Sequence, residues 1–152
     1  MSAVASAYKT TEAQLSEALS LRNQKQYQRF WEVFRTYEIA TLPYSGYVLA
    51  AVIPFAQSKG IDLPTACGTA LSEADRAQLG VVACGKPVDY ESVARGIAQL
   101  QVTDPELRQY YADLYTHDWD EAAKAMRHGF AFIQQGIEAL NSGDQLLIFL
   151  IT

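Results

Sequence analysis

Cysteine and histidine are the residue types in this sequence that could form a nucleophile–base pair. The chain contains two cysteines, Cys67 and Cys84, and two histidines, His117 and His128. A catalytic cysteine needs a base such as His117 within hydrogen-bond reach, and that proximity is a property of the folded chain. We therefore expect both cysteines to be small buried apolar residues, and we keep a Cys–His enzyme site as the alternative.

The same residue types form no pattern for binding a metal ion or a phosphate group. A helix that begins at Asp118 would leave His117 and His128 three turns apart, about 16 Å by helical rise, which is too far for one metal ion. The sequence has no HExxH motif and no paired CxxC motif. The segment ACGKP has Pro87 where a phosphate-binding loop needs Ser or Thr. The sequence therefore predicts no metal ion and no cofactor.

Carboxylates and tyrosines gather around one predicted junction between two helices. Asp113, Asp118 and Asp120 lie there, close in sequence to Tyr110 and Tyr111. Acidic residues at helix starts are stabilised by the helix dipole and need no ligand, and paired carboxylates can also serve acid–base catalysis. We favour a docking surface for another protein, because aromatic residues are enriched at the centres of interfaces.

A second pair of tyrosines flanks a predicted turn in the segment TLPYSGYVL. Loops carry binding residues more often than packed elements do, although these two rings could equally cover the end of the following helix. The candidate partner-binding residues are therefore Tyr44, Tyr47, Tyr110, Tyr111, Asp113, Asp118 and Asp120.

Composition and charge restrict the class of protein. The 152 residues are 49% hydrophobic and 19% charged, which is typical of a folded globular chain, and we expect residues 1–152 to form a single domain. The net charge of −5 argues against a nucleic-acid partner, because a phosphate backbone attracts clustered Lys and Arg. An acidic protein suits a basic protein partner, although a charge of this size also simply keeps a protein in solution.

The sequence also leads to an expectation about where in the cell the protein is located. The N-terminal segment MSAVASAYKTTEAQ lacks the positive start and the long apolar core of a signal peptide. The longest apolar candidate, GYVLAAVIPFA, is shorter than the roughly 20 residues that a membrane span needs. We expect a cytoplasmic protein that binds no membrane and whose cysteines are free thiols.

Capping signals and apolar stripes predict a mostly helical chain. Helices are predicted to begin at Thr11, Ser45, Ser72, Asp89, Asp104 and Asp118. The helical pattern after Thr11 extends, with one polar break, as far as Leu42, and Pro43 ends it. The longest pattern extends from Asp118 to Gly143. Residues 61–71 have no clear period and are predicted to connect two helices.

The two ends of the chain are predicted to pair in a central sheet. The run LLIFLI at about residues 146–151 is apolar on both faces, too short for a helix, and follows a Gly143–Asp144 turn, which is typical of a strand covered on both sides. Its best partner is the strand predicted at about residues 3–8, and VVAC is an alternative third strand or a buried connection. The expected fold is α+β, predominantly helical, with a small central sheet covered by helices.

Several segments resemble the YfbM-like family of uncharacterised bacterial proteins. They are the opening TTEAQLSEAL after a short strand, the closing FIQQGIEALNSGDQLLIFLIT, and VARGIAQLQVTDPELRQYY, which is similar to that family's helix followed by an acidic-capped ELR helix. The resemblance covers the two ends of the chain and residues 93–111. It implies a fold that starts with a strand and closes with a helix, a glycine and an apolar strand. It implies no activity and no catalytic residues.

These observations lead to three expectations about function. The favoured one is a small cytoplasmic bacterial protein that binds another protein, of the immunity type that neutralises a toxin, with an acidic surface facing a basic toxin domain. The second is a small enzyme with a Cys or carboxylate site. The third is a homodimeric scaffold whose aromatic surface faces a second copy of the chain.

Overall fold

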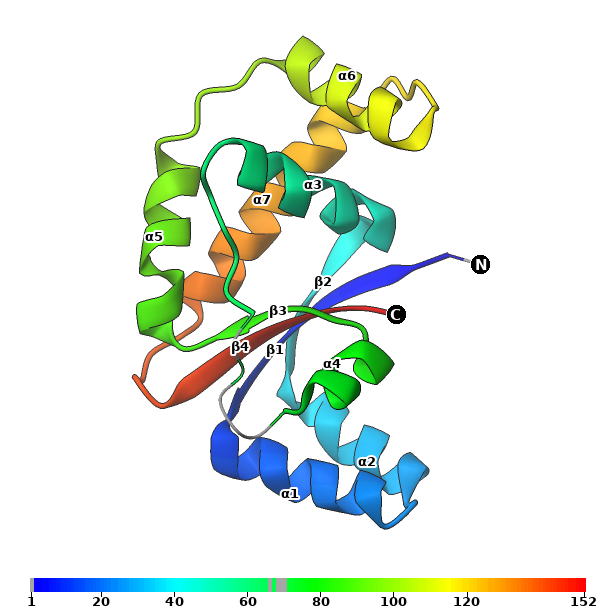
Figure 1. Cartoon of the computed structure of the whole chain (residues 1–152), viewed down its shortest axis with the longest axis vertical. Coiled ribbons are helices and arrows are strands. Elements are labelled where there is room, and N and C mark those ends of the chain that lie inside the picture. Colours follow the sequence, from blue (N-terminus) through cyan, green and yellow to red (C-terminus); the bar gives the residue numbers. More distant parts are fainter. Residues whose placement is uncertain (1, 66, 68–70) are drawn as a thin grey trace.

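The computed structural model, which describes residues 2–65, 67 and 71–152, is an α+β fold that is predominantly helical, as expected (Figure 1). In chain order its elements are β1 (Val4–Thr11), α1 (Glu12–Asn23), α2 (Tyr27–Phe34), the 3-10 turn η1 (Arg35–Tyr37), β2 (Glu38–Ser45), α3 (Gly46–Ser58), α4 (Glu73–Leu79), β3 (Val81–Gly85), α5 (Pro87–Ala98), α6 (Asp104–Tyr115), α7 (Ala122–Glu138) and β4 (Gln145–Ile151).

The described strands form one antiparallel sheet in the order β2-β1-β4-β3. The strands nearest the two ends of the chain are the central pair, with seven residue pairs in register from Ala5 opposite Ile151 to Thr11 opposite Gln145. This confirms the predicted pairing of the two terminal segments. Of the two alternatives left open for VVAC, a strand or a buried connection, the structure shows the strand, because β3 pairs with the other edge of β4.

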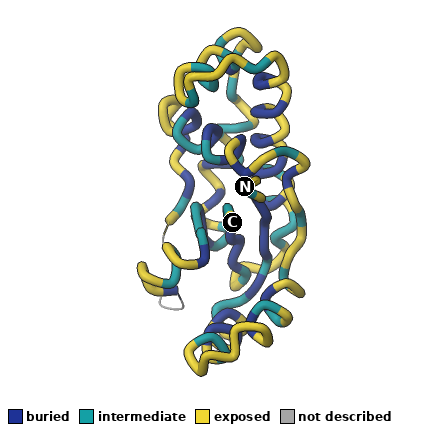
Figure 2. Tube along the Cα trace, turned by 90° about the vertical axis from the view of Figure 1, so that its right-hand side faces the viewer, coloured by how far each residue is buried: buried dark blue, intermediate teal, exposed yellow. Residues whose placement is uncertain are grey.

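The last strand is apolar on both sides because helices cover both faces of the sheet. Leu147 and Phe149 point into a core, here called the α7-side core, formed with α3, α5, α6 and α7. Leu146, Ile148 and Leu150 point into the α1-side core, formed with α1, α2 and α4. Figure 2 shows buried positions along the strands inside the molecule and exposed positions on the outer helices. A strand in this position needs no polar face, which accounts for its composition.

Local capping signals place several helix ends where they were predicted. Thr11 Oγ1 accepts from Gln14 N at 3.2 Å, while Gln14 Oε1 accepts from Thr11 N at 3.1 Å, which completes a capping box. Ser72 caps α4 by accepting from Asp75 N at 3.1 Å, and Gly80 ends that helix in the left-handed region at φ 75°. Helix α3 starts after its Ser45 cap and continues through Pro54.

The largest error in the sequence prediction is the missing strand β2. Residues 38–42 were assigned to the helical section that precedes Pro43, but they belong to an edge strand that pairs with β1. Only Leu42 of this strand is buried, so the sequence has no alternating apolar pattern there. Pro43 is compatible with the strand because β2 lies at the edge of the sheet, where its missing N–H breaks no ladder.

Three predicted helix starts are wrong by one to four residues. Helix α7 begins at Ala122, because Asp118 and Trp119 have no regular secondary structure and Asp120 and Glu121 form a turn before the helix. Helix α6 is capped by Thr103, so Asp104 is its first helical residue. Helix α5 begins at Pro87, and Asp89 lies in its first turn, where its carboxylate accepts from Lys86 N at 2.8 Å.

Two further predictions concern the connection over residues 61–71 and membrane-spanning helices. The connection expected over residues 61–71 has no helix or strand at 61–65, 67 and 71, and the rest of it lies outside the described residues. Within the part of the chain that the structure describes, no helix is both long enough and apolar enough to cross a membrane.

Tyr90 connects α5 to the sheet through a buried hydrogen bond. Its side chain is fully buried, and its hydroxyl donates a 3.0 Å hydrogen bond to the carbonyl oxygen of Leu147 in β4. Burial raises the pKa of Tyr90 well above its ordinary value of 10.0, and the neighbouring Cys84, Cys67 and Asp89 raise it further. The hydroxyl therefore keeps its proton in the folded state.

We expect Tyr90→Phe to lower the free energy of unfolding by about 1 kcal/mol at neutral pH, because it removes one buried hydrogen bond. The raised pKa of Tyr90 contributes stability that is fully present below pH 10 and is lost as the pH rises further, because the unfolded chain releases the proton first. Urea unfolding across alkaline pH should show a steeper loss of stability for the wild type than for Tyr90→Phe. Equal slopes would contradict this account of Tyr90.

Candidate functional site

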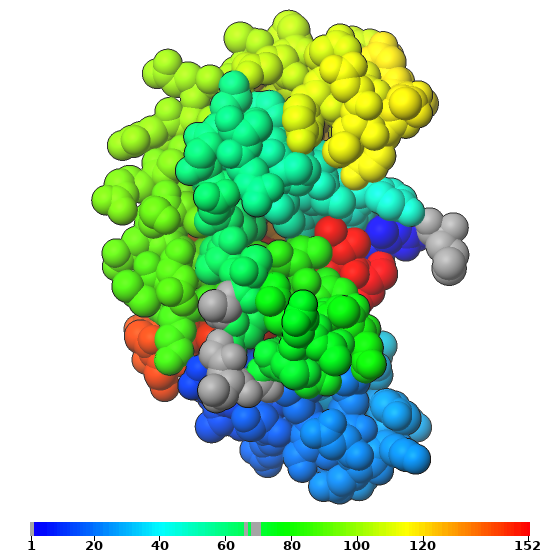
Figure 3. All heavy atoms as spheres, viewed as in Figure 1, coloured from blue at the N-terminus to red at the C-terminus, as the bar shows by residue number. Residues whose placement is uncertain are grey.

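The candidate site lies where α6, the connection after it, and the start of α3 meet. Figure 3 shows α6 and this connection at one end of the molecule, next to α3. Helix α6 ends at Tyr115, and Thr116 takes a left-handed conformation at φ 50° that turns the chain back toward the helix. The aspartates of the connection therefore approach α6 from its outer side.

Arg108 on α6 organises this connection. Its Nε donates to Asp118 Oδ1 and its Nη2 to Asp118 Oδ2, both at 2.8 Å, and Nη2 also donates to Asp120 Oδ1 at 2.7 Å. The bidentate pair with the guanidinium lowers the pKa of Asp118. All three side chains are open to solvent, so these ion pairs orient the connection more than they stabilise the fold.

A continuous set of rings in edge-on or tilted contact, here called the aromatic row, crosses the same region. It consists of Tyr47, Tyr115, Tyr111, Trp119, Tyr44 and His128, and successive ring centroids are 4.8 to 6.2 Å apart. Tyr115 Oη donates a 2.6 Å hydrogen bond to the carbonyl oxygen of Tyr47, which fixes α6 against the start of α3. Partial burial raises the pKa of Tyr111 and of Tyr115, so both rings are neutral.

The row is exposed at its ends and half-buried in between. Tyr47 retains 52% of its surface and Leu114, the residue before Tyr115, retains 45%. His128 at the other end is also exposed, while Tyr111, Tyr115, Trp119 and Tyr44 are half-buried. An apolar surface with this degree of exposure and a fixed geometry is suited to contact with another macromolecule.

The structure brings five of the seven predicted binding residues together. Tyr44, Tyr47 and Tyr111 belong to the aromatic row, and Asp118 and Asp120 lie on the adjoining connection. Tyr110 points elsewhere, into the α7-side core, where its ring lies 5.0 Å from that of Phe55. Asp113 is exposed, and its carboxylate accepts from Gln109 of the same helix at 2.7 Å.

Arg108 and Trp119 are the main residues that the sequence prediction omitted. Arg108 is ten residues before Asp118, and no fixed spacing links a helix residue to a turn of unknown shape. Trp119 was assigned to the apolar stripe of a helix, whereas it precedes α7 and packs between Tyr111 and Tyr44. One feature of the sequence does point to this surface. Tyr111 and Tyr115 are four residues apart, and this spacing places both rings on one face of α6.

The cysteines lie away from this surface. Cys67 and Cys84 are both buried and belong to the α1-side core, whereas His117 is exposed on the connection after α6, beside the helices of the other face. The structure therefore does not assemble the Cys–His pair that was kept as an alternative. Among the described residues, no group of three His, Cys, Asp or Glu side chains is arranged to hold a metal ion.

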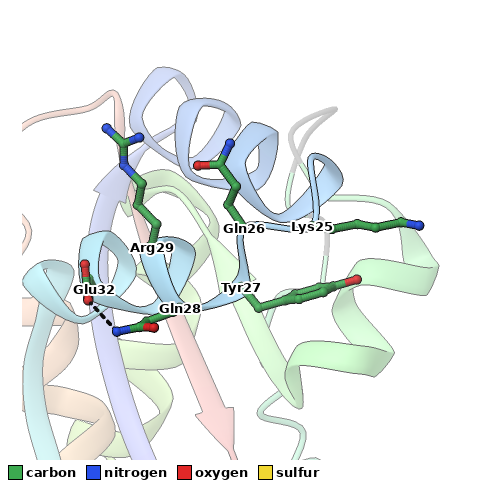
Figure 4. Close-up of a pocket in the computed structure, with 6 residues that line it drawn as sticks. All are labelled: Lys25, Gln26, Tyr27, Gln28, Arg29 and Glu32. Atoms are coloured by element: carbon green, nitrogen blue, oxygen red, sulfur yellow. Dashed lines mark hydrogen bonds between the residues drawn. The ribbon is translucent and has the colours of Figure 1, made fainter.

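A hollow on the described surface lies beside the turn between α1 and α2. It has a volume of about 450 Å³ and is lined by Lys25, Gln26, Tyr27, Gln28, Arg29 and Glu32. Figure 4 shows these side chains diverging from one short segment, with a single hydrogen bond of 3.3 Å from Gln28 to Glu32. The hollow lacks the converging polar groups of an active site, so the aromatic row remains the stronger candidate.

Comparison of the chain with protein-family models, with curated protein sequences and with solved structures gave no match. The resemblance to the YfbM-like family therefore stays a prediction, and the surface itself is the basis for the proposed function.

Proposed function

We propose that this protein is a protein-binding module whose aromatic row forms the centre of the interface. The observation that carries the proposal is the continuous, partly exposed set of rings that α3, α6 and the connection before α7 hold together. More specifically, we propose that it is a cytoplasmic, immunity-type protein that neutralises a toxin by direct binding.

The chemistry of the surface matches the anatomy of a protein interface. Interface centres are rich in Tyr and Trp and poor in charge, and polar residues surround them. Tyr47, Tyr111 and Trp119 supply the rings, while Asp118 and Asp120 on the adjoining connection supply exposed charge. The hydrogen bond from Tyr115 to the Tyr47 carbonyl restricts the rings before binding, which reduces the entropy lost on association.

The charge of the surface favours a basic partner. Arg108 offsets only one of the two negative charges of Asp118 and Asp120, so the connection remains acidic. The chain as a whole carries a net charge of −5. A basic toxin domain would be attracted to this end of the molecule, and the association rate would fall as salt is added.

We expect the double substitution Tyr47→Ala and Leu114→Ala to weaken partner binding about 100-fold, since truncating a central interface residue costs about 2 kcal/mol or more. Tyr27→Ala is the matched control, because Tyr27 is 55% exposed against 52% for Tyr47 but lies on the α1–α2 turn. The partner is recovered from the source cell with the wild-type chain as bait and identified by mass spectrometry. Its affinity for each variant is then measured by calorimetry.

The proposal fails if the Tyr27 control loses as much affinity as the double variant, or if both variants bind like the wild type. Recovery of only further copies of this chain would support the homodimeric scaffold instead. The toxin part is tested separately, by co-expressing the recovered partner with and without this protein and measuring cell growth. A partner that is harmless when expressed alone would exclude the immunity role and leave protein binding intact.

A further inference from the structure

A second hollow, of about 260 Å³, lies beside the α1-side core and is lined by Tyr8, Trp31, Arg35 and Thr152. We call it the Tyr8 hollow. Its residues come from β1, α2, η1 and the end of β4, so separate parts of the chain converge on it, unlike the hollow beside the α1–α2 turn. Trp31 and Arg35 are four residues apart on one continuous helical stretch, which directs both side chains to the same side.

Aromatic rings form one wall of the Tyr8 hollow, and packing fixes their positions. The Tyr8 ring stacks on Phe34 with centroids 4.6 Å apart, and Trp31 meets Phe34 edge-on at 5.9 Å. Phe34 is fully buried, whereas Trp31 is half-buried and leaves part of its indole open. An indole held in this way offers an apolar surface to a flat ring.

The hydroxyl of Tyr8 is a polar group directed at this hollow. Tyr8 is only 6% exposed, and its hydroxyl makes no hydrogen bond of ordinary length and angle to another described residue; the nearby Ser6 hydroxyl is paired with Thr41 Oγ1 at 3.4 Å. The Tyr8 hydroxyl is also not sealed from solvent, so it opens to the hollow that its side chain lines. Burial, followed by the charge of Glu38, raises the pKa of Tyr8, and Ser6 and Arg35 offset only part of this rise. The hydroxyl therefore keeps its proton and can donate it to a ligand.

Arg35 supplies an exposed positive charge at the same hollow. No ion pair joins its guanidinium to a described carboxylate, whereas arginines of α1, α6 and α7 each have such a partner. A free guanidinium is suited to binding a carboxylate through two parallel hydrogen bonds. Glu38 is the acid whose charge reaches Tyr8, but it is exposed, does not line the hollow and accepts a 2.8 Å hydrogen bond from Thr41.

We propose that the Tyr8 hollow binds a small aromatic carboxylate. The ligand ring lies against the Trp31 indole, its carboxylate pairs with Arg35, and Tyr8 Oη donates a hydrogen bond to a carboxylate oxygen. A small inorganic anion would leave the indole uncovered, and an uncharged ring would leave Arg35 without an acceptor. The volume of the hollow is at the lower limit of ordinary ligand sites, which restricts the ligand to a small molecule such as benzoate.

The site is separate from the surface proposed for partner binding. It uses no residue of the aromatic row, and α2 and α6 lie at opposite ends of the molecule (Figure 1). Because Arg35 and Thr152 are exposed, a bound ligand stays partly in water, and we expect a dissociation constant of about 0.1–1 mM. Either proposal can fail without affecting the other.

The experiment is a titration of the full-length chain with sodium benzoate, followed by proton–nitrogen nuclear magnetic resonance. The chain has two tryptophans, so Trp119 in the aromatic row is an internal control for Trp31. We expect a saturable shift of the Trp31 indole N–H signal and none of the Trp119 signal. A Trp31 signal that does not move at about ten times the expected dissociation constant, or an equal shift of Trp119, would overturn the proposal.

Matched probes test which parts of the ligand are recognised. Benzamide keeps the ring of benzoate without its charge, and acetate keeps the charge without the ring. We expect each to bind about tenfold more weakly than benzoate, because each loses one of the two kinds of contact. Benzamide that binds as tightly as benzoate would rule out the ion pair, and acetate that does so would rule out the ring contact.

Variants then test the individual residues. Arg35→Gln should weaken benzoate binding about tenfold, and Glu38→Gln should strengthen it about twofold, because the first removes an attractive charge and the second a repulsive one. Arg29→Gln, an equivalent change on α2 outside the Tyr8 hollow, is the matched control and should bind like the wild type. Equal affinities of the two arginine variants would refute the role of Arg35.

Tyr8→Phe keeps the ring and removes only the hydroxyl. We expect it to weaken benzoate binding about threefold to tenfold and to leave the urea midpoint of unfolding unchanged, because the hydroxyl has no hydrogen bond to lose within the described chain. This separates it from Tyr90→Phe, which removes a buried hydrogen bond. A midpoint lowered as much as in Tyr90→Phe would show that the Tyr8 hydroxyl is paired inside the protein, and the proposal would fail.

Discussion

Removing residues 146–152 is expected to leave a chain that no longer folds cooperatively. Five consecutive side chains of β4, Leu146 to Leu150, are at most 1% exposed, and they contribute to both cores. Burying five large apolar side chains stabilises a fold by roughly 7–15 kcal/mol, which is comparable to the whole stability of a typical domain. The truncation also leaves β1 and β3 without the strand that joins them.

The measurement is urea unfolding followed by far-ultraviolet circular dichroism, with hydrogen exchange of the remaining amides. Deleting Thr152 alone is the control, because this residue is exposed and exchanges only two backbone hydrogen bonds with Val4, at 2.8 and 2.9 Å. We expect that control to unfold cooperatively with a loss of about 1 kcal/mol. A cooperative transition in the longer truncation would show that β4 is not the centre of the fold.

Gly80→Ala is expected to lower the free energy of unfolding by about 3–4 kcal/mol, the sum of two separate effects. Gly80 has a φ of 75°, which is strained for any residue with a Cβ. A Cβ at this position would also clash with the backbone carbonyl oxygen of Ile151, so the end of β4 must move. That movement would disturb the 2.9 Å hydrogen bond from Ile151 N to the Gly80 carbonyl.

Gly60→Ala measures the effect of backbone strain at a positive φ without a steric clash. Gly60 has a φ of 79°, and a Cβ there would meet no atom within 4 Å. We therefore expect a loss of about 1–2 kcal/mol from the left-handed conformation alone. Urea unfolding of both variants gives the loss in free energy of unfolding for each. The difference between the two losses measures how closely the corner between α4 and β3 packs against β4. Equal losses at Gly60 and Gly80 would contradict that packing.

The two cores have different parts in the functional argument. The α7-side core carries the helices that hold the aromatic row, since α3, α6 and α7 all pack into it. The α1-side core holds both cysteines and contributes none of the rings of the aromatic row. Changes that destabilise either core are expected to affect partner binding through global folding, whereas surface changes such as Tyr47→Ala test binding alone.

Much of the fold followed from local patterns in the sequence. The apolar run near the C-terminus, together with the turn before it, predicted a strand covered on both sides, and the structure confirms β4 as central. The caps at Thr11, Ser45 and Ser72 are also local, because each depends on hydrogen bonds between residues two or three positions apart. Such contacts are present in short segments and need no tertiary partner.

The features that the sequence missed depend on partners distant in the chain. Strand β2 is exposed along most of its length, so its conformation comes from pairing with β1 and not from an apolar period. Asp118 was assigned to a helix start because its spacing from Glu121 fits a capping box. Arg108 instead binds Asp118 and Asp120, and the helix begins only at Ala122.

The sequence by itself determined the class of fold, the central terminal strands and the position of most helices. Hydrophobic periodicity and helix capping depend on residues that are close together in the sequence. Only the tertiary structure decided which tyrosines share a surface and that Cys67 and Cys84 lie in the same buried core. Both depend on how segments far apart in the chain pack against one sheet. Tyr110 and Tyr111 are adjacent in sequence, yet one ring enters the core and the other joins the aromatic row. That division follows from the orientation of α6 over α3, which no local pattern encodes.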